Sequence, residues 1–307
     1  MYKYTMPELP EVQTTVNGLH SVLPELSIQA IWSDYQNKLH ATKKHIKSAE
    51  YFKKFQKELA GKKFIGVSRR GKNILIELTG GLTILIHMKM TGHVMYGKYK
   101  QEKGVWKSVL NGALADPFNQ FIHLVFTLSN GFHLVLSDVR KFAKVLIIKT
   151  ADLAKHPDLS ALGREPLDTT FSFSIFQSQI LKRPNWKIKS ALLDQTLIAG
   201  IGNIYSDEIL WLGDVHPLSI TAKIPEKNMH AMWNATKNVL KKSIGMGGDS
   251  LSDYRNAFGE KGGFQLCHNA YRQTGKKCPK KGCGGIIERV KVGGRSAHFC
   301  PKHQRKY

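Results

Sequence analysis

Two short pairs of metal-binding residues near the C-terminus constrain the fold of this sequence more than any other feature. Cys278 and Cys283 are separated by four residues, and Cys300 and His303 by two. Pairs that can each form a turn, joined by a span long enough for a β-hairpin, have the spacing of a structural zinc site. The tail is basic and has little core of its own, so we expect the ion to supply folding energy.

We therefore predict one structural zinc ion bound by Cys278, Cys283, Cys300 and His303. The ion is expected to be structural because protein ligands fill all four tetrahedral positions. The fourth ligand stays open, since the tail contains other candidates. They are Cys267, His268 and His298.

Positive charge is the second strong feature. The chain carries 46 Lys and Arg against 23 Asp and Glu, a formal net charge of +23. Such a surplus predicts a polyanionic partner, nucleic acid first and an anionic membrane surface second. No run approaches the roughly 18 apolar residues that span a bilayer, and the start lacks the apolar core of a secretory signal. We expect a cytoplasmic, nucleoid-associated protein with no membrane partner, although charge alone names no activity.

The first half of the chain has the pattern of one helix followed by hairpins. Apolar residues recur with helical spacing from Val12 to Leu23, and Pro24 ends the pattern. Strand-like segments cover 72–78 and 82–88 around a glycine pair, 121–128 and 132–136 around Asn130-Gly131, and 144–149. We assign residues 7–150 to an antiparallel β-sandwich with a helix at its entrance.

The second half has mainly helical patterns. Residues 151–172 are polar and irregular, as is typical of a linker, and helical patterns then cover 186–197, 203–212 and 225–244. Gly200 and Gly202 permit a tight reversal before Asn203, a good N-cap whose helix presents amides and dipole to a phosphate. A Gly-x-Gly between helices is more often an ordinary turn. We assign 173–265 to a helical domain and 266–307 to the metal-binding tail.

Six motifs and the metal site occur in the order found in one family. The motifs are Pro7-Glu8-Leu9-Pro10-Glu11-Val12, Arg69-Arg70-Gly71-Lys72, His87-Met88-Lys89-Met90-Thr91-Gly92, Asp138-Val139-Arg140-Lys141-Phe142, Gly163-Arg164-Glu165-Pro166-Leu167 and Gly200-Ile201-Gly202-Asn203-Ile204-Tyr205. From Met6 onward the sequence resembles bacterial formamidopyrimidine-DNA glycosylases. The resemblance implies an α+β multidomain fold: an N-terminal antiparallel β-sandwich with its helix, a helix-two-turns-helix DNA-binding domain and a C-terminal zinc-finger β-hairpin.

The resemblance also implies an activity in DNA base-excision repair. The family binds damaged double-stranded DNA, excises 8-oxoguanine and formamidopyrimidines, and cuts the abasic strand by β,δ-elimination. Pro7 is then expected to be the nucleophile, because a free α-amine titrates near roughly 8 and is partly neutral at physiological pH. Glu8 is expected to protonate the sugar oxygen and Glu165 to lie near the sugar. Glu11 belongs either to the pocket or to the helix N-terminus, where its charge is favourable.

The same resemblance assigns the residues that contact DNA. The phosphate contacts are expected to be Lys72, Asn203 and Arg295, and Lys72 is counted with the catalytic residues as well. Met90, Arg140 and Phe142 are expected to fill the gap left by an everted nucleotide, since apolar wedges replace lost stacking and arginine bonds a base edge. Without the surrounding motifs, Met90 and Phe142 would be assigned to the core.

The N-terminus departs from the family pattern. Residues 1–5 precede the motif, and a Pro7 held in a peptide bond has no lone pair for attack on C1′. We expect residues 1–6 to be an extension or a mis-assigned start, with Met6 the functional initiator that is then removed. The opposing hypothesis is a catalytically inactive relative that binds damaged DNA.

Three further departures are milder. His303 stands where the family usually has a fourth cysteine, and the first cysteine pair is two residues further apart than usual. Lys89 replaces the common glycine before Met90, where it is expected either to add a phosphate contact or to alter how the wedge inserts. Alternative functions are an endonuclease VIII-like glycosylase for oxidised pyrimidines and a zinc-ribbon RNA-binding protein. We expect the protein to be a monomer.

Overall fold

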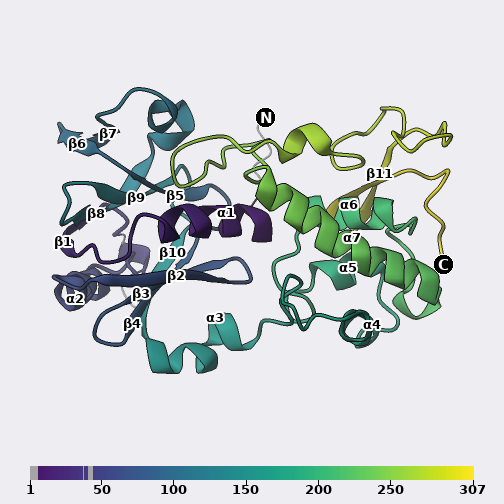
Figure 1. The fold of residues 1–307 in the computed structure, drawn as a ribbon, viewed down its shortest axis with the longest axis horizontal. Coiled ribbons are helices and arrows are strands. Elements are labelled where there is room, and N and C mark those ends of the chain that lie inside the picture. Colours follow the sequence, from purple (N-terminus) through teal and green to yellow (C-terminus); the bar gives the residue numbers. More distant parts are fainter. Residues whose placement is uncertain (1–5, 37, 41–43) are drawn as a thin grey trace. The chain divides into compact units, whose positions relative to one another are not determined.

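The computed structural model describes residues 6–36, 38–40 and 44–307, which divide into two compact units (Figure 1). Unit 1 comprises Met1–Ser160 and the later segment Gly247–Gly263, and unit 2 comprises Ala161–Met246 and Phe264–Tyr307. The expectation for residues 1–5 falls outside the described residues. Each unit has buried residues of its own and is described by itself.

Unit 1 is built on two four-stranded antiparallel sheets. The first has the order β1 (Ile28–Ser33), β8 (Ile122–Leu128), β9 (His133–Asp138), β5 (Gly92–Gly97). The second has the order β10 (Lys144–Lys149), β4 (Leu82–His87), β3 (Asn73–Leu78), β2 (Phe64–Arg70). The predicted glycine-pair hairpin is β3–β4 and the predicted Asn130-Gly131 hairpin is β8–β9, with Gly80, Gly81 and Gly131 at positive φ. A separate hairpin joins β6 (Tyr99–Glu102) to β7 (Val105–Ser108).

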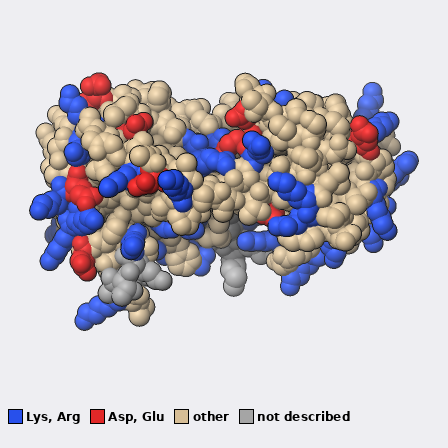
Figure 2. All heavy atoms as spheres, turned by 90° about the horizontal axis from the view of Figure 1, so that it is seen from below, with Lys and Arg blue, Asp and Glu red and all other residues tan. Residues whose placement is uncertain are grey.

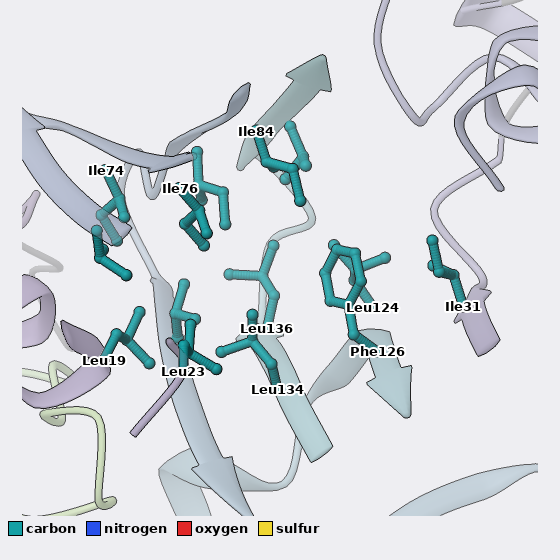
Figure 3. Packing of buried hydrophobic residues seen from close by; sticks show 14 of the residues in the cluster. Leu19, Leu23, Ile31, Ile74, Ile76, Ile84, Leu124, Phe126, Leu134 and Leu136 are labelled. Carbon is teal, nitrogen blue, oxygen red and sulfur yellow. The ribbon is translucent and has the colours of Figure 1, made fainter. Parts of the chain in front are cut away.

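One hydrophobic core fills the space between the two sheets (Figure 3). Alternate residues of β3 and β4 (Ile74, Ile76, Ile84) and of β8 and β9 (Leu124, Phe126, Leu134, Leu136) are buried together in one cluster. This period of two is what a strand with one face in a core requires. The predicted antiparallel β-sandwich is confirmed.

Helix α1 (Leu9–His20) packs against β2 and β5. It begins with a capping box between Glu8 and Glu11 and ends before Pro24, and it buries Val12, Val16 and Leu19 in the sandwich core. Helix α2 (Ala49–Leu59), capped by Ser48, was not predicted from the sequence. The stretch expected to be an irregular linker contains two short helices, η4 (Thr150–Lys155) and α3 (Pro157–Ser160).

The segment Gly247–Gly263 returns to unit 1, although we expected it within a helical domain of residues 173–265. Ala257 joins the sandwich core, and its carbonyl accepts a hydrogen bond from the Tyr96 amide at 2.8 Å. A Cβ on Gly18 would lie 2.8 Å from the Ala257 Cβ, so this close approach needs the glycine. Arg255 is fully buried, and its Nη2 donates to both carboxylate oxygens of Asp116 at 3.0 and 3.1 Å.

Unit 2 combines four helices with a C-terminal hairpin. The helices are α4 (Phe173–Leu181), α5 (Ile188–Leu193), α6 (Asn203–Leu212) and α7 (Glu226–Gly245), and the hairpin joins β11 (Glu288–Val292) to β12 (Arg295–Phe299). The predicted bounds of α6 are confirmed and those of α7 differ by one residue at each end. Helix α5 is shorter than predicted, because the Asp194 side chain bonds the Thr196 amide at 2.9 Å and closes a turn. None of the described helices combines the length and the apolarity needed to cross a membrane.

Candidate nucleic-acid interface and metal centre

Pro7 and Glu8 lie at the N-terminus of α1, and both are buried. The Glu8 amide donates to the Glu11 carboxylate at 2.8 Å, which fixes the backbone immediately after the proline. The positive end of the helix dipole favours carboxylates at this position. The predicted nucleophile and acid are therefore adjacent groups on a rigid helix start.

Glu11 connects this helix start to the returning segment of unit 1. Its second carboxylate oxygen accepts the Asp249 amide at 2.8 Å, while its carbonyl accepts the Tyr254 hydroxyl at 2.8 Å. Burial raises the pKa of Tyr254 far above its ordinary value, so the phenol stays a donor. From the sequence, Glu11 was expected either in the pocket or at the helix N-terminus. In the structure its carboxylate caps the helix through the Glu8 amide and also binds the Asp249 amide of the returning segment.

The expected wedge residues lie on two turns of unit 1. Met90 belongs to the turn after β4, and Arg140 and Phe142 belong to residues 138–143, which we call the wedge loop. The Arg140 guanidinium stacks over the Phe142 ring with 4.3 Å between carbon and centroid. Phe142 is 46% exposed, so its ring is accessible to a ligand.

Asp138 holds both wedge turns together. Its buried carboxylate accepts the Thr91 hydroxyl, the Tyr35 hydroxyl at 3.0 Å and the Ala143 amide at 2.7 Å. The Arg140 amide in turn donates to the Thr91 hydroxyl at 3.2 Å. A single carboxylate thereby joins the turn carrying Met90 to the loop carrying Arg140 and Phe142. Asp138 is part of a family motif, but this joining role was not predicted from the sequence.

Lys72 occupies the tight turn between β2 and β3. Gly71 has φ of 58° there, and its carbonyl accepts the Arg69 guanidinium at 3.0 Å. The neighbouring His87 is at the end of β4, and burial, together with the charges of Lys89 and Lys72, lowers its pKa to about 3. The histidine is therefore neutral and adds no charge to the lysines beside it.

In unit 2, Glu165 and Asn203 flank a braced loop. The Arg164 amide donates to the Leu197 carbonyl at 3.1 Å, and Ala199 returns a bond to Arg164 at 2.9 Å. The Gln195 side chain bonds Gly200 and Ile201 at 2.9 and 2.7 Å, which fixes the glycine turn before α6. Asn203 is the first residue of that helix rather than its N-cap, which is Gly202.

A buried chain of charges links the start of α6 to the C-terminal hairpin. The Lys189 ammonium, fully buried, contacts the Asn203 carbonyl at 3.1 Å and the Asp207 carboxylate at 2.6 Å. The other Asp207 oxygen accepts the amide and the ring of His298 on β12 at 3.0 and 2.8 Å. Arg295 is exposed at the opposite end of β12, after two glycines at positive φ. The chain thus connects the two expected phosphate-binding elements of unit 2.

Sequence reasoning missed Lys189 and Asp207 as a pair. The sequence does contain a signal for this pair. Both residues lie within apolar helical segments, and a charged side chain that is buried there usually has a partner of opposite charge. Asp116 and Arg255 were also missed, and they are 139 residues apart, so no local pattern connects them.

The predicted metal ligands converge on one point of unit 2. The ligand atoms of Cys278, Cys283, Cys300 and His303 all lie within 4.8 Å of one another. The His303 Nε2 faces the Trp211 carbonyl at 3.3 Å, while Nδ1 lies 3.5 Å from the Cys278 sulfur. An outer carbonyl of this kind selects the tautomer whose other nitrogen binds metal. Three thiolates and one imidazole fit a closed, structural zinc site, and one structural zinc ion is assigned here.

Two of the three alternative ligands, Cys267 and His298, are engaged elsewhere. His298 bonds Asp207, and the Cys267 sulfur lies 3.7 Å from the Met246 sulfur. A Cβ on Gly285 would lie 2.5 Å from the Cys300 sulfur, so the knuckle beside the site requires glycine. The longer spacing between the first two cysteines is therefore compatible with a four-ligand cluster.

The surface carries the charge that the composition predicts. Lys and Arg side chains outnumber Asp and Glu on the face drawn in Figure 2. Several acids of unit 1 are already paired with lysines, including Asp158 with Lys144 and Asp34 with Lys141. The Lys and Arg side chains in excess of the acidic ones give the surface a net positive charge, which favours binding of a polyanion.

Models of known protein families match segments along most of the chain. Three family models match: the formamidopyrimidine-DNA glycosylase N-terminal domain at residues 6–145, the H2TH domain of the same glycosylase at 162–255, and a zinc finger found in FPG and IleRS at 275–302. The formamidopyrimidine-DNA glycosylase of Pelotomaculum thermopropionicum is 34% identical over 98% of this chain and 99% of its own. That of Streptococcus pneumoniae serotype 4 is 36% identical over 98% of this chain and 100% of its own.

Solved structures of two complexes with DNA have a similar fold. A complex between the Lactococcus lactis Fpg and DNA containing an abasic site has a TM-score of 0.81 and 32% identity, covering 97% of this chain and 100% of the other. A complex of MutM with DNA containing carbocyclic 8-oxo-G has a TM-score of 0.81 and 31% identity, covering 98% and 100%.

Proposed function

The chain belongs to the formamidopyrimidine-DNA glycosylase family, a family of zinc-finger DNA-repair enzymes, and we propose that it excises oxidised purines from duplex DNA. The proposed substrates are 8-oxoguanine and formamidopyrimidines, and the proposed second step is cleavage of the abasic strand by β,δ-elimination. The observation that carries the proposal is the exposed pair of Arg140 and Phe142, held by Asp138 beside the turn of Met90. Solved relatives bound to abasic-site and 8-oxo-G DNA support the same substrate class.

The proposed nucleophile is the nitrogen of Pro7, freed by removal of residues 1–6. The family model begins to match at Met6, which supports a functional start at that methionine. The secondary amine would attack C1′ as the bond to the base breaks, and the base would leave with the proton that the amine loses. The C1′–O4′ bond would then break, with the nitrogen lone pair forming the C=N bond and a proton going to the sugar oxygen. The resulting iminium acidifies the adjacent sugar proton and so permits elimination. Glu8 is the proposed proton donor to the sugar oxygen, because the bond from its amide to Glu11 fixes it beside the amine.

The remaining residues have proposed roles in holding DNA. Lys72, Asn203 and Arg295 are the proposed phosphate contacts, and Glu165 is a proposed carboxylate near the sugar. The zinc ion holds the C-terminal hairpin and takes no part in the reaction, because its ligand set is closed. We propose a monomer that acts on chromosomal DNA in the cytoplasm.

Borohydride trapping tests the proposed nucleophile. Protein that begins at Pro7 should form a covalent complex with a duplex containing 8-oxoguanine, because borohydride reduces the iminium to a stable amine. Protein that retains residues 1–5 and Met6 should not be trapped, since an amide nitrogen is not nucleophilic. Trapping of both forms, or of neither, would contradict the assignment of Pro7.

Two controls sharpen this experiment. Glu8→Gln in the Pro7-initiated protein should keep DNA binding and lose most of the trapped product, because the amide cannot protonate the sugar. A duplex containing an oxidised pyrimidine should be trapped less than the 8-oxoguanine duplex. The opposite ranking would favour the endonuclease VIII-like alternative.

A further inference from the structure

Lys89 has a backbone conformation that lysine rarely adopts. Its φ is 57°, in the left-handed region, on the turn that joins β4 to Met90. The turn is tight, because the Gly92 amide bonds the Met88 carbonyl at 3.1 Å and a Cβ on Gly92 would lie 2.5 Å from that oxygen. Glycine would adopt this φ without strain, so the lysine side chain is present at a cost in stability.

His87 holds Lys89 in this conformation. The Lys89 amide donates to the His87 Nδ1 at 3.0 Å, so the imidazole acts as an acceptor on that side. An imidazole that accepts at Nδ1 is neutral, which agrees with the depressed pKa of His87 described above. The turn is therefore fixed by a specific side-chain bond.

The Lys89 ammonium is close enough to Lys144 to be repelled by it, and Asp158, the partner of Lys144, attracts both lysines. Lys144 is paired in the ladder with His87, which is itself paired with Asn73 next to Lys72. Lys144 is neutralised by Asp158, whereas Lys89 forms no ion pair with any residue that the structure describes. Burial and the charge of Lys144 lower the pKa of Lys89 from its ordinary value, and Asp158 offsets this only in part. Burial and the charge of Lys89 likewise lower the pKa of Lys47, against the opposing charge of Asp138. A further anion beside Lys89 would favour its charged form.

We propose that Lys89 binds a backbone phosphate of the DNA substrate beside the inserted wedge, a contact that glycine at this position cannot make. The proposal rests on the proposed function, because it takes the ligand to be the lesion-containing duplex. The strained turn carries, next to Met90, an ammonium with no ion pair to any described residue, and such a group is suited to bind an anion. The phosphate contact accounts for both the strain and the missing partner.

The test is the salt dependence of binding to a duplex that carries a tetrahydrofuran abasic analogue. The slope of log K against log salt falls by about 0.9 for each phosphate contact removed. Lys89→Gly should lower the slope by that amount and weaken binding about eightfold at 0.1 M salt. The same variant should unfold about 2–4 °C higher, because glycine relieves the strained φ. Lys89→Arg should keep the wild-type slope.

A matched control is available in the same unit. Lys103 has φ of 49° in the turn between β6 and β7, and its side chain is exposed. Lys103→Gly removes one charge and one strained φ, as Lys89→Gly does, and should leave the slope unchanged. Lys72→Ala gives the reference loss for a phosphate contact assigned by family resemblance.

The outcomes separate this inference from the proposed function. An unchanged slope in Lys89→Gly, or an equal loss in Lys103→Gly, overturns the inference even if the thermal shift is seen. Failure of the wild-type protein to prefer the abasic-analogue duplex over undamaged DNA contradicts the proposed function instead. A reduced slope in Lys89→Gly, restored in Lys89→Arg, supports the inference.

Discussion

Asp138 is fully buried and accepts hydrogen bonds from Tyr35, Thr91 and the Ala143 amide. Each donor would lose its partner if the carboxylate were removed, and a buried donor without an acceptor is costly. Asp138 therefore positions two turns, which carry Met90, Arg140 and Phe142, the proposed wedge residues.

Replacing Asp138 tests this role. Asp138→Asn should destabilise the protein by about 1–3 kcal/mol, because its amide group presents a donor to groups that donate. Excision of 8-oxoguanine should fall more than cleavage of a preformed abasic site, since an abasic nucleotide is easier to evert. Urea unfolding and the two cleavage rates measure these effects. Tyr35→Phe is the milder control, expected to cost about 1 kcal/mol, and equal loss of both activities in Asp138→Asn would contradict a role in eversion.

His93 is fully buried on β5, where burial lowers its pKa to about 4 and its Nε2 bonds the side-chain amide oxygen of Asn119 at 2.8 Å. Above pH ~6.5 the histidine is neutral in both the folded and the unfolded chain, and its full contribution to stability is present. Between pH ~6.5 and ~4 only the unfolded chain binds the proton, so stability falls as pH falls. The total loss is about 3 kcal/mol.

The pH dependence can be measured directly. His93→Gln should reduce the slope of unfolding free energy against pH by up to about 1.4 kcal/mol per unit in that window. His87 also has a depressed pKa, so a residual slope is expected in the variant. An identical slope in the two proteins would show that His93 titrates normally.

At the scale of elements, sequence patterns predicted those with strong local signals. The Asn130-Gly131 hairpin and helix α6 follow from turn chemistry and apolar period, and they were confirmed. Helix α2 was missed, because its apolar stripe is only three residues, Phe52, Phe55 and Leu59, among lysines and glutamates. Helix α5 was overextended, because the apolar run continues through an Asx turn at Asp194.

The metal ligands could be predicted from the sequence pattern alone, whereas the other residues of the candidate site could not. Metal ligands could be named, because short spacing brings them together whatever the surrounding fold. The wedge and phosphate residues depended on family motifs, since a lone Lys72 or Phe142 has no local pattern that separates it from surface or core. The network around Asp138 joins residues that are 103 and 47 positions apart, and periodicity does not report such contacts.

The molecule divides into two units, and the zinc cluster found among the described residues lies in unit 2. Removing zinc should therefore unfold the β11–β12 hairpin while the sandwich core of unit 1 stays folded. Hydrogen exchange at β11 and β12 should become fast in Cys278→Ser or after chelation, and exchange at β3 and β4 should not change. Simultaneous loss of protection in both regions would contradict independent cores.

The discontinuity of unit 1 could not be predicted from sequence. Asp249 bonds Glu11 across 238 positions, and neither neighbourhood contains a signal for the other. Net charge, in contrast, is a property of composition alone, and the polyanionic partner it predicted agrees with the family.

The return of Gly247–Gly263 to unit 1 has a consequence for synthesis on the ribosome. Translation must proceed from Ser160 to Gly263, another 103 residues, before the sandwich can receive Ala257 and Arg255. At about 5–20 residues per second this takes roughly 5–20 s. During that interval the nascent domain has an incomplete core, and Asp116 cannot yet form its ion pair with Arg255. The growing chain is then most open to chaperone capture, and a pause in translation between the two segments prolongs this exposure.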